Sequence, residues 1–394
     1  MQRTAVRTAI LVLGLHLVAC GNGGETLTFD VRVVNAQGQS PFAGQAFEQL
    51  EIEVAQQGAE VVRFSGDALD FDFGAIVRSP AAQTRLRLRL LQTGGPTFVG
   101  SVPPFSPLAS MGGLDLVVGA AGSCVELPAL RANAGASVVR LGTFALVAEA
   151  NGALVAWDLL TMDDLPLTLD LGGPGQIVGL GDREVVLLGV RTEIFNLELG
   201  ETRPVALHAG AGAESAALRL STGEALIVGP GPAYSIVTPA GEVRVGTLQS
   251  AHARAALVET SAGLFVAGPG EPFVETIESD LELSLALPFG ETPVDAMPLS
   301  SDFLLVADDG ESVRVRCAAS CAVEDHPALP SGRSFGELRA GDELGRIDNE
   351  GVLRGLSSGV SAPVTGAFAL ESEMVFGIGS TGSFICFPND LAPL

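Results

Sequence analysis

A unit of about 40 residues recurs over the second two-thirds of this chain, and it constrains the fold more than any other feature. Its clearest copy, residues 215–247, has four short apolar or alternating segments. Turn residues separate them at Ser221-Thr222-Gly223, Gly229 to Pro232 and Pro239-Ala240-Gly241. Short apolar segments between such turns predict four strands joined as a meander rather than helices.

Six further copies align with this unit when each is anchored at its second segment. The anchors are Ala145, Val185, Ala225, Leu264, Phe303, Glu343 and Glu373, with spacings of 40, 40, 39, 39, 40 and 30 residues. Four strands repeated every 40 residues are typical of a β-propeller blade, which buries its faces only against neighbouring blades. We therefore predict an all-β chain with a seven-bladed β-propeller over residues 123–394.

Residues 26–122 lack this period. Apolar and polar residues alternate strictly from Leu27 to Val33 and from Arg85 to Leu90, as in half-buried antiparallel strands. Other strand candidates are Leu50 to Val54, Val61 to Phe64, Thr97 to Val99 and Leu114 to Val118. This density of strands predicts a small β-sandwich of immunoglobulin-like or transthyretin-like type before the propeller.

The N-terminus carries the features of an export signal. Arg3 and Arg7 precede the apolar run Ile10 to Ala19, which is too short to span a bilayer. The end of the run, Leu17-Val18-Ala19-Cys20, resembles the lipobox of bacterial lipoproteins. This resemblance implies that residues 1–19 are a cleaved signal peptide and that Cys20 is lipidated and anchors the protein in a membrane. Residues 20–25 would form a flexible, glycine-rich tether.

Charge agrees with an exported protein that does not bind nucleic acid. The chain has a net charge of −24, which repels phosphate backbones. It contains no lysine, which excludes Schiff-base chemistry at a lysine amine. Because Gly21 rather than aspartate follows the cysteine, the lipoprotein resemblance favours the cell envelope and the outer membrane of a two-membrane bacterium.

Four cysteines besides Cys20 form an even set, which in an exported chain favours two disulfides among three possible pairings. In the fifth unit, Cys317 ends the third strand and Cys321 begins the fourth. They should face each other across a hairpin.

The last unit ends after its third strand, where Cys386 occupies the place of Cys317. The missing strand has a candidate upstream, because the segment from Cys124 resembles the fourth strand of the fifth unit. We expect residues 123–130 to supply that strand, to close the ring and to bond Cys124 to Cys386.

The repeat and its closure resemble kelch-like and related seven-bladed propellers of secreted and lipid-anchored bacterial proteins. The chain departs from kelch blades because the Gly-Gly pair after the second strand is replaced, for example by Val228-Gly229-Pro230. Trp157 is the single tryptophan, so the repeating blade tryptophan is absent as well. The resemblance concerns the fold and assigns no subfamily.

Motifs for chemistry are mostly missing. After the predicted signal the chain has three histidines, His208, His252 and His326, without metal-ligand spacing. Zinc is disfavoured because no histidine accompanies the cysteines. Carboxylate pairs such as Asp163-Asp164 and Asp308-Asp309 could serve a glycosidase, but we interpret them as acidic turns on an acidic surface. We expect no metal and no cofactor.

These features predict a non-catalytic lipoprotein that acts as a binding or scaffold module for a protein or glycan partner. The alternative is a carbohydrate-active hydrolase or lyase on a propeller scaffold. An enzyme should place two carboxylates within about 10 Å of each other at one mouth of the central channel.

A partner should bind where the turns between second and third strands meet the connections between blades. The candidate ligand-binding residues there are His208, His252, Asp308, Asp309, Asp348 and Glu350. Their charge predicts a negative face and a basic or neutral partner. Asp163 and Asp164 should lie on the opposite face.

Overall fold

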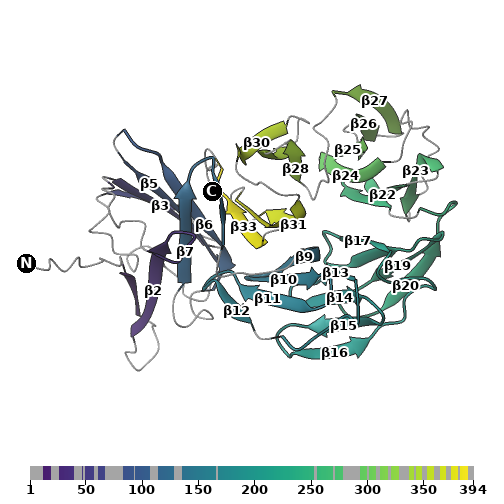
Figure 1. Ribbon diagram of the computed structural model, residues 1–394, viewed down its shortest axis with the longest axis horizontal. Coiled ribbons are helices and arrows are strands. Elements are labelled where there is room, and N and C mark those ends of the chain that lie inside the picture. The colour runs from purple at the N-terminus through teal and green to yellow at the C-terminus, as the bar shows by residue number, and fades with distance from the viewer. Residues whose placement is uncertain are drawn as a thin grey trace, which may run out of the picture.

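A computed structural model shows how the predicted strands assemble (Figure 1). It describes residues 12–18, 26–39, 47, 49–56, 61–66, 83–92, 94–106, 114–127, 135–165, 167–252, 255–268, 271–277, 293–299, 301–307, 311–317, 321–327, 337–340, 343–347, 353–358, 364–369, 374–379 and 382–388. Within these ranges every regular element is a strand, which confirms the all-β class. The described residues contain no helix long and apolar enough to cross a bilayer.

The N-terminal strands form one seven-stranded sheet. In spatial order they are β1 (Val12–Val18), β2 (Thr26–Val34), β7 (Leu114–Ala120), β6 (Phe98–Phe105), β5 (Thr84–Leu91), β3 (Gln49–Gln56) and β4 (Val62–Gly66). All neighbours are antiparallel except β2 and β7, which are parallel.

Strand β7 joins two parts of this sheet, because residues 114–117 pair with β2 and residues 118–120 pair with β6. Val31 of β2 lies in the same buried cluster as Leu50, Ile52 and Leu88 of β3 and β5. The two parts therefore share one core.

Seven small antiparallel sheets follow among the described residues. The first three are β9 (Gly135–Leu141), β10 (Phe144–Glu149), β11 (Leu154–Asp158) and β12 (Asp163–Leu165); β13 (Gln176–Leu180), β14 (Glu184–Leu188), β15 (Thr192–Asn196) and β16 (Glu201–Pro204); and β17 (Ala216–Arg219), β18 (Ala225–Val228), β19 (Ala233–Val237) and β20 (Val243–Thr247). The next three are β21 (Ala256–Thr260), β22 (Gly263–Gly268) and β23 (Glu271–Ile277); β24 (Pro293–Leu299), β25 (Asp302–Ala307), β26 (Ser312–Cys317) and β27 (Cys321–His326); and β28 (Glu337–Ala340), β29 (Glu343–Ile347) and β30 (Leu353–Ser358). The last combines β31 (Val364–Ala369), β32 (Val375–Gly379) and β33 (Gly382–Cys386) with β8 (Cys124–Glu126).

The first strand of each small sheet lies toward a common centre (Figure 1). First strands of successive sheets contact one another along the series β9, β13, β17, β21 and β24, and β31 contacts β9. The last sheet thus returns to the first, and the arrangement is propeller-like.

Both expected disulfides are present. Cys124 is bonded to Cys386, where β8 pairs antiparallel with β33. Cys317 is bonded to Cys321 across the hairpin of β26 and β27. Their Cα atoms are 4.0 Å and 4.1 Å apart, respectively, so both link directly opposed residues of neighbouring strands.

A second buried cluster joins the N-terminal sheet to the first and last small sheets. It contains Val117 of β7, Trp157 of β11 and Phe376 of β32, whose ring lies 5.6 Å from that of Trp157. Leu160, in the turn after β11, belongs to the N-terminal core, and its carbonyl accepts a hydrogen bond of 2.6 Å from Asp115 N. Continuous packing of this kind holds the parts together as one body.

Candidate functional site

Turns between second and third strands lie against the connections that lead to the next sheet. Leu171 N donates to the Gly152 carbonyl at 2.8 Å, and Val190 N donates to the Leu171 carbonyl at 3.1 Å. A Cβ atom on Gly229 would lie 2.5 Å from His208 Nε2. We call this surface the connection face. Its described part comprises the turns 150–153, 189–191 and 229–232 and the connections 167–175, 205–215 and 248–252.

His208 lies in the connection between β16 and β17 and is buried. Its backbone N donates to Ser235 Oγ at 2.9 Å, and its Nδ1 lies 2.9 Å from the same oxygen. Burial lowers the pKa of His208, so the imidazole is neutral at pH 7. The side chain therefore fastens the connection to β19 and is not offered to a ligand.

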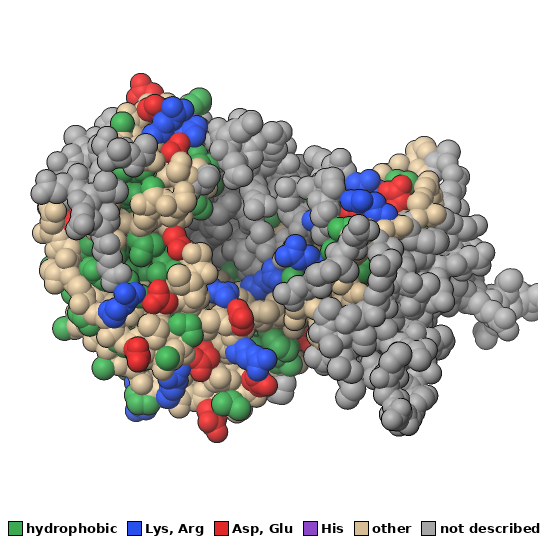
Figure 2. Space-filling view, turned by 180° about the vertical axis from the view of Figure 1, so that it is seen from behind, with side chains coloured by type: hydrophobic (Ala, Val, Ile, Leu, Met, Phe, Trp, Pro, Cys, Tyr) green, Lys and Arg blue, Asp and Glu red, His purple; other side chains and the backbone are tan. Residues whose placement is uncertain are grey.

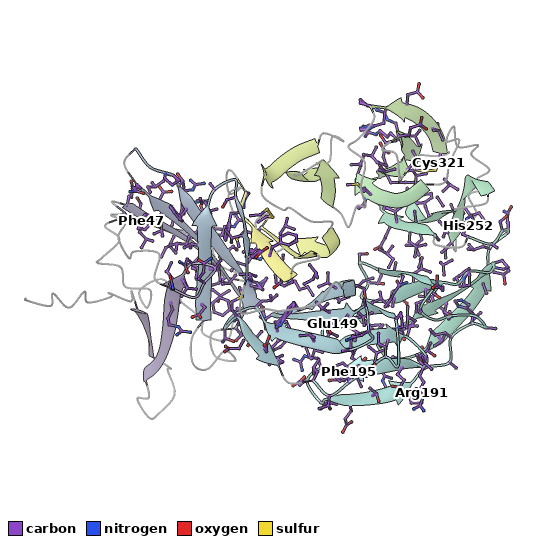
Figure 3. The ribbon with its side chains drawn as sticks, in the orientation of Figure 1. Phe47, Glu149, Arg191, Phe195, His252 and Cys321 are labelled. Atoms are coloured by element: carbon purple, nitrogen blue, oxygen red, sulfur yellow. A yellow bond between two sulfur atoms is a disulfide. The ribbon has the colours of Figure 1, made fainter. Side chains whose placement is uncertain are left out.

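His252 occupies the equivalent place before β21 (Figure 3). It is 0% exposed. Its Nε2 lies 2.8 Å from Glu275 Oε1 on β23. The buried Glu275 carboxylate also accepts hydrogen bonds from Gln249 N at 2.5 Å and Ser250 N at 2.8 Å. A buried carboxylate requires such partners. Glu275 of β23 therefore holds residues 249–252 of the connection in place through these hydrogen bonds.

Ser235 and Glu275 are the residues that sequence reasoning missed. Ser235 is paired with Ile227 of β18, and Glu275 with Val266 of β22. Ile227 and Val266 both stand two residues after the repeat anchor. The available signal was a polar residue of the third strand, ten residues after the anchor in one unit and eleven in the other, which the pairing places opposite the same position of the second strand.

The described connection face carries few charges. Its charged side chains are Asp170, Arg191 and Glu214, and glycine, alanine and proline dominate the remainder. Val190, at the tip of one turn, is 76% exposed. This part of the face is therefore close to neutral, whereas the sequence predicts a negative potential for the whole face.

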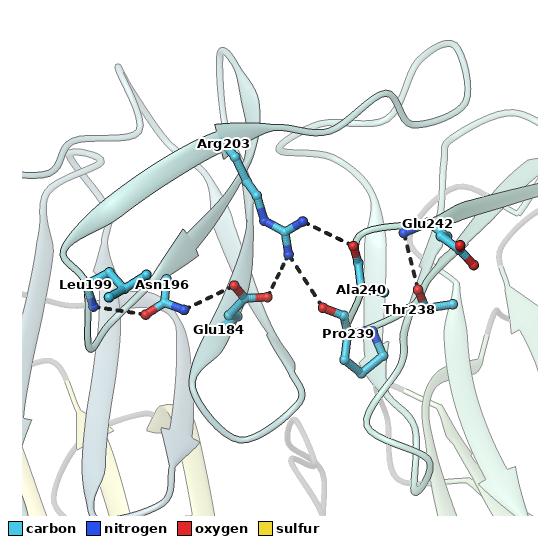
Figure 4. Close-up of polar contacts among 8 residues, drawn as sticks. All are labelled: Glu184, Asn196, Leu199, Arg203, Thr238, Pro239, Ala240 and Glu242. Carbon is cyan, nitrogen blue, oxygen red and sulfur yellow. Dashed lines mark hydrogen bonds and ion pairs between the residues drawn. The ribbon is translucent and has the colours of Figure 1, made fainter.

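The opposite face, which we call the hairpin face, is charged; it includes the turns 181–183, 197–200, 221–224 and 238–242. Arg203 Nη2 pairs with Glu184 Oε2 at 2.8 Å, and its guanidinium donates to the carbonyls of Pro239 and Ala240 in the next sheet at 3.5 Å and 3.3 Å (Figure 4). Arg219 reaches Asp182 of the preceding sheet at 3.2 Å. Basic and acidic side chains likewise lie side by side on the surface shown in Figure 2. Such pairs link neighbouring sheets.

Asp163 and Asp164 lie at the start of β12, next to the hairpin turn after β11, and are exposed. Nearby, burial raises the pKa of the Asp158 carboxyl, against hydrogen bonds from Leu160 and Thr161 that lower it. Burial also raises the pKa of Asp115, although Arg32 binds that carboxylate at 2.6 Å and 2.8 Å. The charge of Asp163 adds to both increases. Two carboxyl groups with a raised pKa, those of Asp115 and Asp158, therefore lie where the N-terminal sheet meets the first small sheet.

The remaining predicted site residues, Cys20, Asp308, Asp309, Asp348 and Glu350, lie outside the described residues. Within the described ranges, no group of three or more His, Cys, Asp or Glu side chains could hold a metal ion. The structure brings His208 and His252 to equivalent positions on one face, each engaged with its own third-strand partner.

Comparison with known proteins gives a likeness of fold. No family model and no curated protein matches the chain. A solved structure of streptogramin B lyase, a propeller, superposes with a TM-score of 0.52 at 11% identity, over 68% of this chain and 98% of the lyase. The computationally designed Ika8 protein superposes with a TM-score of 0.45 at 14% identity, over 66% of this chain and 97% of its own.

Proposed function

We propose that this chain is an exported lipoprotein that acts as a non-catalytic binding or scaffold module at the cell envelope. In this proposal residues 1–19 are removed, Cys20 carries the lipid and the outer membrane is the site of anchoring. The domains are a β-sandwich over residues 26–122 and a seven-bladed, kelch-like β-propeller over residues 123–394, closed by strand 123–130. The succession of seven small sheets and the return of β31 to β9 support the blade number.

The observation that carries the proposal is the engagement of both histidines of the connection face. Catalysis by a histidine requires a ring nitrogen within reach of substrate. His208 and His252 are buried beneath the connections and serve to hold them. The described part of this face therefore offers backbone and small side chains on a rigid support, which suits recognition of a surface.

A neutral protein surface or glycan suits this face better than a charged partner. The three charged side chains of its described part give no strong field, so steering by charge would be weak. Exposed Val190 and the adjacent glycine turns offer apolar and backbone contact area instead.

Two exposed aliphatic residues at opposite ends of β15 allow a matched test. Val190 precedes β15 on the connection face, and Leu199, 66% exposed, follows it on the hairpin face. The mature protein should be crosslinked in intact cells and its envelope partner identified. Val190→Arg should then abolish capture of that partner, and Leu199→Arg should retain it. Equal losses from both variants, or turnover of an envelope glycan by the purified protein, would refute the proposal.

A further inference from the structure

The edge of β2 is occupied by a segment that the proposed processing removes. β1 pairs antiparallel with β2 over seven residues, from Val12 opposite Arg32 to Val18 opposite Thr26. On its other side β2 pairs with β7. Removal of residues 1–19 therefore leaves β2 as the outer strand of the N-terminal sheet.

This edge differs from β4, at the other side of the same sheet, and from the strand farthest from the common centre in each small sheet, as far as the structure describes them. β2 has nine residues and contains neither glycine nor proline. The others are shorter, and each is three residues long, contains glycine or proline, or carries adjacent acids: β4, β8, β12, β16, β20, β23, β27 and β30. Short length, proline and charge protect sheet edges from pairing with another chain.

The charge on β2 is also partly neutralised. Arg32 forms two hydrogen bonds, of 2.6 Å and 2.8 Å, with the Asp115 carboxylate on β7. The uncovered edge thus presents a long row of backbone donors and acceptors with little to repel an incoming strand.

We propose that the β2 edge of the mature protein, residues 26–34, is a docking site for an extended apolar strand of a partner protein, added in the antiparallel direction of β1. The proposal rests on the proposed removal of residues 1–19. Main-chain hydrogen bonds supply affinity in such strand addition, and alternate side chains supply specificity. The sequence VLGLHLV of β1 shows the kind of strand that this edge accepts.

The anchor places this edge near the membrane. The tether consists of the six residues 20–25 and begins with Cys20, the residue proposed to carry the lipid. Fully extended, it spans at most about 20 Å before β2 begins. The partner strand should therefore belong to a protein at the same membrane surface.

The test uses the pairing register. Mature protein, residues 20–394, is purified in detergent as a Phe29→Cys variant and mixed with a peptide of residues 11–18 that carries Leu15→Cys. Phe29 and Leu15 are directly opposed in the β1–β2 pairing. We expect disulfide trapping at least about tenfold faster than with the Thr26→Cys control, because Thr26 is opposite Val18, three positions from Leu15 in this register. A Leu13→Pro peptide should trap about tenfold more slowly, because it lacks one backbone donor.

Amide exchange should slow within residues 26–34 when the peptide is bound. Equal trapping at both cysteines, or protection confined to other strands, would overturn the proposal. Protection of β2 without peptide in a dimeric protein would also overturn it, because a second copy would then occupy the edge. An intact-mass measurement first reports whether residues 1–19 are absent. If they are retained in cells, β1 keeps the edge covered, and the anchoring and docking proposals fail together; if they are absent and trapping fails, the docking proposal alone fails.

Discussion

Replacement of the ring-closing disulfide should destabilise the protein far more than replacement of the hairpin disulfide. Cys124–Cys386 spans 262 residues, whereas Cys317–Cys321 spans 4. The entropy of loop closure gives about 5.6 kcal/mol for the long loop and about 2 kcal/mol for the short one. The two bonds join similarly opposed strand residues, so the local packing lost is comparable. A difference of about 3 to 4 kcal/mol should therefore reflect loop length.

The comparison uses Cys124→Ala/Cys386→Ala and Cys317→Ala/Cys321→Ala double variants, so that no free thiol remains. Unfolding in guanidinium chloride can be followed by the fluorescence of Trp157, the only tryptophan, which packs on Phe376 of the last sheet. The first variant should unfold at a markedly lower denaturant concentration. Equal losses of unfolding free energy in the two variants would show that loop closure is not the source of the stability.

Four further predictions address the site, the junction and the anchor. Gly229→Ala should destabilise the protein by roughly 1–3 kcal/mol, because the added Cβ atom would meet His208 Nε2. The control Gly231→Ala should leave the thermal unfolding temperature unchanged, because a Cβ atom there has no other atom within 4 Å. Equal effects of the two variants would contradict the contact with His208. Glu275→Ala should lower the free energy of unfolding by about 3 kcal/mol, because the backbone donors of Gln249 and Ser250 lose their acceptor. Amide hydrogen exchange at these two residues should become faster. Unchanged exchange would exclude Glu275 as their acceptor. Burial raises the folded-state pKa of Asp158, so folding favours the protonated carboxyl, and this contribution to stability is present at low pH and lost as pH rises through that pKa. Asp158→Asn should therefore raise the free energy of unfolding at pH 7, and the gain should shrink toward pH 4. A gain that does not depend on pH would refute this reasoning. Cys20→Ala should abolish lipidation and release the protein from membranes, and normal retention with a normal lipid mass would rule out the anchor.

The strand pattern of the repeat was readable from sequence because turn residues mark each strand end. Residues 215–247 contain the four predicted strands, observed as β17 to β20. The cysteine pairing was also predictable, because the last unit lacks a strand and the segment at Cys124 matches it. Both inferences use local chemistry and the regularity of the repeat, which tertiary contacts do not alter.

Contacts between distant segments were not predictable in the same way. Alternation assigns Arg85, Arg87 and Arg89 to the solvent face of β5, yet Arg87 is buried and lies 3.9 Å from Glu53 on the adjacent β3. Leu160 follows a blade strand in sequence but enters the N-terminal core. Periodicity shows which side of a strand faces inward, and it does not show which neighbour covers that side.

The histidines illustrate the same limit at the site. Their position in the connections was readable, but their burial depends on Ser235 and Glu275, which lie 27 and 23 residues further along the chain. A polar residue in an apolar strand signals a buried partner only when the opposing segment is known.

Closure of the last sheet by β8 also sets the order in which the protein can mature. β8 precedes all strands of the other six small sheets in the chain, and its partner β33 follows all of them. At about 5–20 residues per second, the 262 residues between Cys124 and Cys386 separate the two strands by roughly 15–50 seconds of synthesis. A chain that stops before β33 cannot form this pairing or its disulfide, and it leaves β8 and the Cys124 thiol without their partners. Formation of this sheet therefore depends on synthesis of both segments, which lie 262 residues apart in the sequence.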